Sequence, residues 1–171
     1  MDLFRRGERE RAFGELVKSY SERLYWHVRT LVGNHDDADD ILQDVFTKVW
    51  QGLSGFRAEA GLFTWIWRIA TNEAISFLRR HRDSEEVSLD AIQPGGDIDP
   101  VKAQSLLHQA IAQLPPKQRA VFSLRYFEEL PYDQIARITG SGQASLRASY
   151  HFAETKVREF ILSHADFLTR D

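Results

Sequence analysis

The sequence of 171 residues contains no cysteine. Without thiols the chain can form neither a disulfide framework nor a thiolate-bound metal site, which excludes disulfide-rich secreted domains and zinc fingers. It also lacks an apolar run long enough to span a bilayer, and its charged N-terminus, Met1–Gly7, has no apolar segment of the kind that a secretory signal needs. We therefore expect a cytoplasmic protein.

An excess of positive charge is absent as well, since the net charge is −3 and the isoelectric point is about 6.1. A domain that binds duplex DNA tightly by itself is usually basic, so this balance argues against that function. The charges are nevertheless segregated, because residues 36–44 carry five aspartates whereas residues 68–82 carry four arginines. One surface is thus suited to a basic protein and another to phosphate.

Strand-like alternation of apolar and polar residues is missing too, and apolar residues instead recur at helical spacing. We expect an all-α chain in which Gly33-Asn34 ends the first helix and Asp36 or Asp37 caps the second. The expected helices cover residues 11–31, about 36–50, 62–82, a stretch restarting at Pro100, 115–129, 131–139, and a long final helix after the Gly140-Ser141-Gly142 break.

Periodicity lapses between residues 83 and 99, where Gln93-Pro94-Gly95-Gly96-Asp97 has the composition of a linker. We therefore predict two small helical domains, residues 1–83 and 103–171, joined by a flexible linker at residues 84–102. In the second domain, a helix, a short glycine-containing turn and a longer helix follow the helix-turn-helix order.

The second predicted helix carries an acidic exposed face. Asp37, Asp40, Gln43 and Asp44 lie opposite an apolar stripe that runs from Ala38 to Trp50 at i, i+3, i+4, i+7 spacing. Considered alone, this face is better explained by ordinary solvation of a capped helix. A calcium loop is disfavoured because the EF-hand spacing and its terminal glutamate are missing.

The third predicted helix combines aromatic, amide and arginine groups on its outer face, which comprises Trp65, Arg68, Asn72, Ser76, Arg79 and Arg80. Such a face suits single-stranded nucleic acid, because bases stack on rings, arginine neutralises phosphate and asparagine can bond a base edge. The alternative is that Trp65 and Trp67 belong to the core and that the arginines only cover a helix end.

The last predicted helix is a candidate for reading duplex DNA. We expect Tyr132, Ile135, Ala136 and Ile138 to pack against Leu146, Tyr150, Ala153, Val157 and Phe160. This packing turns outward four polar or basic residues, Gln143, Arg147, His151 and Arg158, in the manner of a major-groove helix. A plain helical hairpin that never touches DNA is the open alternative.

Together these segments resemble bacterial RNA polymerase sigma factors of the extracytoplasmic-function type, which belong to the sigma-70 family and contain only regions two and four. Residues 36–50 are similar to the polymerase-docking helix of that family, and residues 63–80 to its minus-ten recognition helix. Residues 114–127 and 132–136 are similar to the beginning of its region four.

The resemblance implies specific partners. Asp37, Asp40, Gln43 and Asp44 would dock on the clamp of core RNA polymerase, while Phe56, Arg57 and the face around Asn72 would capture the melted minus-ten strand. Arg147 and His151 would enter the minus-thirty-five element, with region four also binding the polymerase flap. The linker would let two weak DNA contacts act together. The family further implies an anti-sigma factor, no cofactor, and catalysis by the polymerase alone, so the chain is expected not to be an enzyme.

Two departures and two rival functions remain. Ser149 and Phe152 stand where arginines are common in the family, so we expect weak, shallowly salt-dependent minus-thirty-five binding by the isolated C-terminal domain. The first rival is a polymerase-independent helix-turn-helix regulator. The second is a metal-dependent hydrolase that uses the aspartates of residues 36–44, although these lack a paired-histidine motif and an evident pocket.

Overall fold

The computed structural model describes residues 8–56, 61–81 and 100–164, and these residues contain α-helices and one 3-10 turn but no strand. The expected all-α class is thereby confirmed. In chain order the elements are α2 (Arg9–Val32), α3 (His35–Gly52), η1 (Leu53–Gly55), α4 (Leu62–His81), α5 (Pro100–Ala112), α6 (Pro116–Tyr126), α7 (Tyr132–Thr139) and α8 (Gln143–Ser163).

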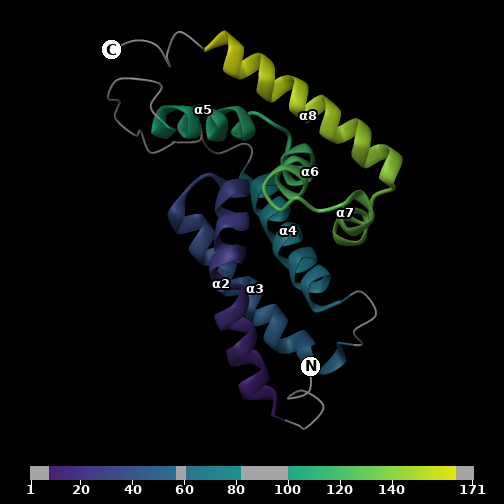
Figure 1. The fold of residues 1–171 in the computed structure, drawn as a ribbon. Helices are drawn as coiled ribbons and strands as arrows, with labels where there is room; N and C mark the ends of the chain where they lie inside the picture. Colours follow the sequence, from purple (N-terminus) through teal and green to yellow (C-terminus); the bar gives the residue numbers. More distant parts are fainter. Residues whose placement is uncertain (1–7, 57–60, 82–99, 165–171) are drawn as a thin grey trace.

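Helices α2, α3 and α4 form an N-terminal bundle (Figure 1). Gly33 ends α2 in the left-handed region at φ 92°, where only glycine escapes the steric penalty of a Cβ atom. The expected aspartate cap of the next helix is wrong, because Asn34 occupies that position and its Oδ1 accepts the Asp37 N–H at 2.8 Å. Asparagine and aspartate cap equally well, so composition alone could not separate them.

Helices α5 to α8 form the C-terminal half, with α8 lying across α5, α6 and α7 (Figure 1). Gly140, at φ 72°, turns the chain between α7 and α8. The expectation that one set of apolar contacts joins α7 to the whole length of α8 is corrected in part. Leu146 does join the cluster that contains Ile135, but Ala153 and Val157 belong to a second cluster with residues of α5 and α6.

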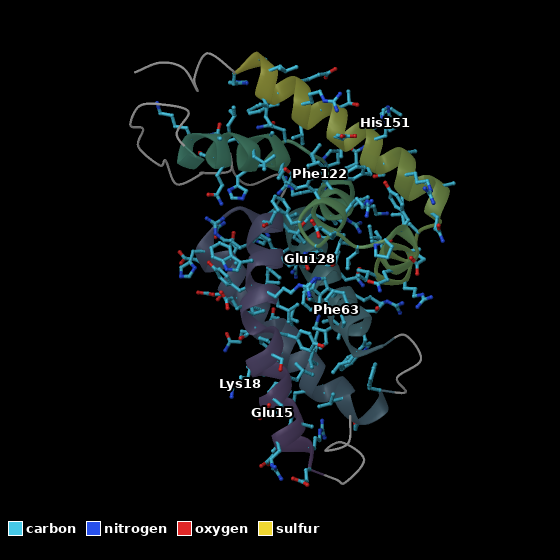
Figure 2. All side chains as sticks on the ribbon, in the orientation of Figure 1. Glu15, Lys18, Phe63, Phe122, Glu128 and His151 are labelled. Atoms are coloured by element: carbon cyan, nitrogen blue, oxygen red, sulfur yellow. The ribbon has the colours of Figure 1, made fainter. Side chains whose placement is uncertain are left out.

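Helix α6 ends at Tyr126, three residues before the expected end at Glu129. The cause is a tight turn in which the Leu130 N–H donates to the Leu124 carbonyl at 3.1 Å, while Glu129 adopts a φ of 53°. The Glu128 N–H also donates to the Ser123 carbonyl at 3.2 Å, which is the 6→1 bond of a helix stop. The left-handed residue of such a stop is usually glycine, so the sequence carried no recognisable signal for it. The turn places Glu128 between the two halves of the molecule (Figure 2).

The two halves pack directly against each other. Helix α4 contacts α7 and α6, and α2 contacts α6. One cluster of buried apolar side chains runs through this boundary, from Leu24, Ile66 and Ala70 on one side to Leu124 and Ile135 on the other. Most of the proposed linker lies outside the described residues, and α5 begins at Pro100, where proline predicted a helix restart.

Candidate partner and nucleic-acid interfaces

The acidic face of α3 is open to solvent. Asp40, Gln43 and Asp44 are exposed, and the carboxylates of Asp40 and Asp44 make no ion pair with any described residue. On the opposite side of the helix, Ala38 and Val45 are completely buried. A rigid helix therefore presents two uncompensated carboxylates and an amide, a pattern suited to a basic or hydrogen-bonding partner.

Asp37 differs from the other members of this face. It is only half-exposed, and both its N–H and its carboxylate bond the side chain of Asn34. These bonds cap the helix and add negative charge at its positive end. Asp37 is therefore engaged in starting α3, whereas Asp40, Gln43 and Asp44 are available to a partner.

The outer face of α4 brings together most of the residues proposed for single-stranded DNA. Arg68, Asn72, Ser76, Arg79 and Arg80 are all exposed. Their spacing places them along one side of the helix, opposite the fully buried Ile66, Ala70 and Ala74. Arg57 lies outside the described residues.

Trp65 does not extend freely from this face. It is half-buried, its ring lies 4.9 Å from that of Phe56, and it covers Gly52 so closely that a Cβ atom there would come within 2.8 Å. Trp67 is fully buried and stacks on Phe63 at 4.0 Å. The alternative in which the tryptophans are core residues is thus correct for Trp67, while Trp65 and Phe56 form a partly accessible aromatic pair at one end of α4.

Arg68 is already bound within the molecule. Its Nε donates to the Arg137 carbonyl of α7 at 2.9 Å, and a second guanidinium nitrogen donates to the same oxygen. Two further arginines cross the boundary, because Arg23 bonds Glu128 at 2.8 Å and Arg119 donates to the Leu31 carbonyl at 2.6 Å. In this arrangement α7 lies against the proposed minus-ten face.

Around Arg23, burial controls the charge of the neighbouring side chains. Burial lowers the pKa of His27 to about 3, with a smaller contribution from the Arg23 cation, so this histidine is neutral. Burial also raises the pKa of the Glu128 carboxyl, although Arg23 acts in the opposite direction. The boundary therefore tolerates the Arg23–Glu128 pair at some electrostatic cost.

The start of α8 presents Gln143, Arg147 and His151 to solvent, and Figure 2 shows His151 on the outer side of the helix. The Arg147 guanidinium lies 4.8 Å from the centre of the Tyr132 ring, which orients it by a cation–π contact. These residues follow at intervals of four, so they form a gently winding polar line.

Arg158 is separated from that line. It stands fifteen residues after Gln143, or about 22 Å along the helix axis, and pairs with Glu154 at 3.4 Å. It borders a groove of about 260 Å³ between α5, α6 and α8, whose apolar wall includes Phe122, Tyr126 and Tyr150. The structure thus places Arg158 two helical turns beyond His151 on the same side of α8, at the edge of this groove and away from the helix start.

This groove was not found by sequence reasoning, and neither were the boundary residues Arg23, His27, Arg119 and Glu128. Two apolar residues that line the groove, Tyr126 and Leu162, are exposed at 51% and 67%, and only the fold reveals that exposure. Within residues 8–56, 61–81 and 100–164, no cluster of three or more histidine or acidic side chains is arranged to hold a metal ion. In those same ranges no helix combines the length and apolarity needed to cross a membrane.

Comparison with known proteins connects these surfaces to one family. The family model described as "Sigma-70 region 2" matches residues 16–84, and that described as "Sigma-70, region 4" matches residues 104–157. The chain is 33% identical over 154 residues to the RNA polymerase sigma-H factor of Pseudomonas aeruginosa, a match that covers 81% of this chain and 79% of the relative. It is 25% identical over 164 residues to the ECF RNA polymerase sigma factor SigW of Bacillus subtilis, with 86% and 88% covered.

Solved structures share the fold. The sigma factor RpoE from Bartonella quintana, in complex with the anti-sigma factor NepR, aligns with a TM-score of 0.72 at 24% identity, covering 88% of this chain and 96% of that one. CnrH, in complex with the cytosolic domain of CnrY, aligns with a TM-score of 0.69 at 20% identity and 90% coverage of both chains.

Proposed function

The chain belongs to the sigma-70 family of RNA polymerase sigma factors, and on this premise we propose how its surfaces share the work of starting transcription. As an RNA polymerase sigma factor of the extracytoplasmic-function type, it directs core polymerase to promoter DNA. Residues 1–83 act as region two and residues 103–171 as region four. Bond-making chemistry belongs to the polymerase, so the chain is not itself an enzyme, and it works in the cytoplasm.

The exposed face of α3 docks on the polymerase clamp. The observation that carries this assignment is that Asp40 and Asp44 are solvent-exposed, have no ion-pair partner among the described residues, and stand on a helix whose other side is buried. Carboxylates in that state are free to meet basic groups without first breaking an internal bond. Gln43 adds a hydrogen-bonding amide, and Asp37 acts mainly by starting the helix.

The outer face of α4 holds the melted minus-ten strand. Asn72 supplies the base-edge hydrogen bonds, Arg79 and Arg80 neutralise phosphates, and the Phe56–Trp65 pair offers a stacking surface. Because the Arg68 guanidinium is bound to the Arg137 carbonyl in the arrangement described, it must leave that carbonyl before it can reach DNA. Base capture offsets the cost of melting through stacking and hydrogen bonds, so no nucleotide hydrolysis is required.

The start of α8 reads the minus-thirty-five element through Gln143, Arg147 and His151. The apolar groove beside α8 receives the polymerase flap, and Arg158 acts at the edge of that groove. The two structural relatives are each described in complex with another protein, an anti-sigma factor in the case of RpoE. By analogy, we propose that an anti-sigma factor also binds this chain.

Transcription in vitro with bacterial core polymerase and a library of genomic fragments tests these assignments. Asp40→Arg/Asp44→Arg should weaken core binding about tenfold or more and lower every start equally, since it reverses the charge of the docking face. Asn72→Ala should preserve core binding but reduce starts in a manner that depends on the minus-ten sequence.

The matched control is Glu10→Arg/Glu15→Arg, which makes the same charge change at two exposed residues near the start of α2, outside the proposed interfaces. It should bind core like the wild type. Specific starts that need neither Asp40 nor Asp44 would reject the docking assignment. Failure of the wild-type chain to associate with core would reject the whole proposal and favour a free helix-turn-helix regulator.

A further inference from the structure

The exposed side of α8 carries an apolar line next to its polar line. Ala144, Ala148 and Phe152 are exposed and spaced four residues apart, as Gln143, Arg147 and His151 are. Each residue of the first line directly follows a residue of the second, so the two lines run side by side along the first three turns. One line can donate hydrogen bonds, whereas the other offers only methyl groups and a ring.

Phe152 is the unusual member of this line. Its side chain is 58% exposed, although phenylalanine is among the residues that proteins bury most readily. The buried side of α8 is formed by Leu146, Ala153 and Val157, and Phe152 lies on the other side of the helix from them. The ring therefore does not support the fold of the described residues, and it remains available to a partner.

On the helix surface the apolar line and the polar line lie on either side of the point directly opposite the buried side of α8. A helix inserted into the major groove presents that opposite side to the base edges, so both lines would face DNA. Major-groove edges offer hydrogen-bonding groups on every base pair, but only thymine offers a methyl group there. The apolar line, hereafter the apolar strip, next to the polar line therefore matches a major groove that presents thymine methyl groups beside the hydrogen-bond acceptors of purines.

We propose that Ala148 and Phe152 are specificity residues that read thymine methyl groups in the minus-thirty-five element, alongside Arg147 and His151, which contact the purines. This inference rests on the proposed function of α8. The occupant of the strip is duplex DNA rather than a protein, because the strip is continuous with Arg147 and with the imidazole of His151 at the helix start. An arginine at this position would attract phosphates whatever the sequence, whereas a phenylalanine can discriminate among bases.

The test uses the holoenzyme on a promoter obtained from the fragment library, with each thymine of the minus-thirty-five element replaced in turn by deoxyuridine. This replacement removes only the 5-methyl group and keeps every hydrogen-bonding group of the base. At the one or two thymines that meet the strip, the affinity of the wild type should fall about fourfold, the equivalent of one apolar carbon lost from a contact.

Variants at residue 152 supply the controls. With Phe152→Ala the affected promoter should bind more weakly, and at the thymine that meets residue 152 the deoxyuridine and thymine forms should bind equally. A thymine that meets Ala148 should keep its discrimination. Phe152→Leu should restore part of the discrimination, because the leucine side chain is also apolar. Phe152→Arg should tighten binding to all sequences, steepen the salt dependence by about one counterion and abolish the discrimination at the thymine that meets residue 152.

Three results would overturn the inference. One is a set of minus-thirty-five elements without thymine, and another is a wild type that binds every deoxyuridine promoter as tightly as the thymine form. The third is a Phe152→Ala variant that loses core binding instead of base discrimination, which would mean that the ring contacts protein. In each case specific starts by the wild type show that the proposed function itself still holds.

Discussion

The buried histidine of the N-terminal bundle makes the stability of this protein sensitive to mild acid. His27 is 2% exposed, and its Nε2 is 2.9 Å from the Thr71 hydroxyl oxygen. Its ring lies 6.1 Å from that of Trp67, and Arg23 is the cation that contributes to its pKa of about 3. No carboxylate contributes to that pKa, so a proton on His27 would be uncompensated.

The sign follows from comparing the folded and unfolded states. In the unfolded chain His27 takes up a proton near its ordinary pKa of 6.5, whereas in the folded chain it stays neutral down to about 3. The unfolded state therefore binds more protons between these values, and stability falls as the pH falls through that window. Each pH unit below 6.5 costs about 1.4 kcal/mol, so roughly 2 kcal/mol is lost by pH 5.

Urea unfolding at pH 7.5 and pH 5, followed by tryptophan fluorescence, measures this loss. The four tryptophans, at positions 26, 50, 65 and 67, all lie in the N-terminal half, so the signal reports on the bundle that contains His27. Other groups also titrate in this range, and the useful quantity is the difference between the wild type and His27→Gln. The wild type should lose about 2 kcal/mol more than the variant, or about 1–2 M in urea midpoint.

His151→Gln provides the matched control, because it removes an exposed histidine in the other half of the molecule. Its pH dependence should follow that of the wild type. If His27→Gln and the wild type lost the same stability between pH 7.5 and pH 5, His27 would not be neutral in the folded bundle. The account of its burial would then be refuted.

Three other predictions concern the core, the helix-turn-helix and the boundary between the halves. Trp67→Ala should cost about 3–5 kcal/mol in the same urea assay, because the indole is fully buried. Gly140→Ala should cost about 1 kcal/mol through backbone strain alone, since its φ is 72° and no atom lies within 4 Å of the added Cβ. Glu128→Arg should drive α2 and α6 apart, because it places a second cation against Arg23. The chain has no cysteine of its own, so one cysteine can be introduced into each half and labelled with a dye. Energy transfer between the two dyes should decrease with Glu128→Arg and stay unchanged with the control Glu159→Arg.

Helical periodicity predicted the elements and much of the core. The apolar stripe through Ala38, Ile41, Val45 and Val49 is buried as expected, because an amphipathic helix has only one way to hide such a stripe. The exposed polar face of α3 follows from the same geometry. Ends of helices were less predictable where two residues cap equally well, as with Asn34, or where a non-glycine residue stops the helix, as at Glu129.

Contacts between distant segments could not be predicted in the same way. Nothing near Arg68 in the sequence indicates that its guanidinium binds the carbonyl of Arg137, because a backbone carbonyl has no residue-specific signature. The half-buried state of Trp65 likewise depends on Gly52 lying beneath its ring. Periodicity therefore identified which residues could meet DNA, while only the packed structure showed which of them are already engaged.

The most direct test of the central claim is promoter-specific initiation by core polymerase supplied with this chain. We expect discrete start sites with the wild type, a uniform loss with Asp40→Arg/Asp44→Arg, and a sequence-dependent loss with Asn72→Ala. Start sites that are absent with the wild type, or that survive both changes at full strength, would contradict the assignment of α3 to the polymerase and of α4 to the promoter.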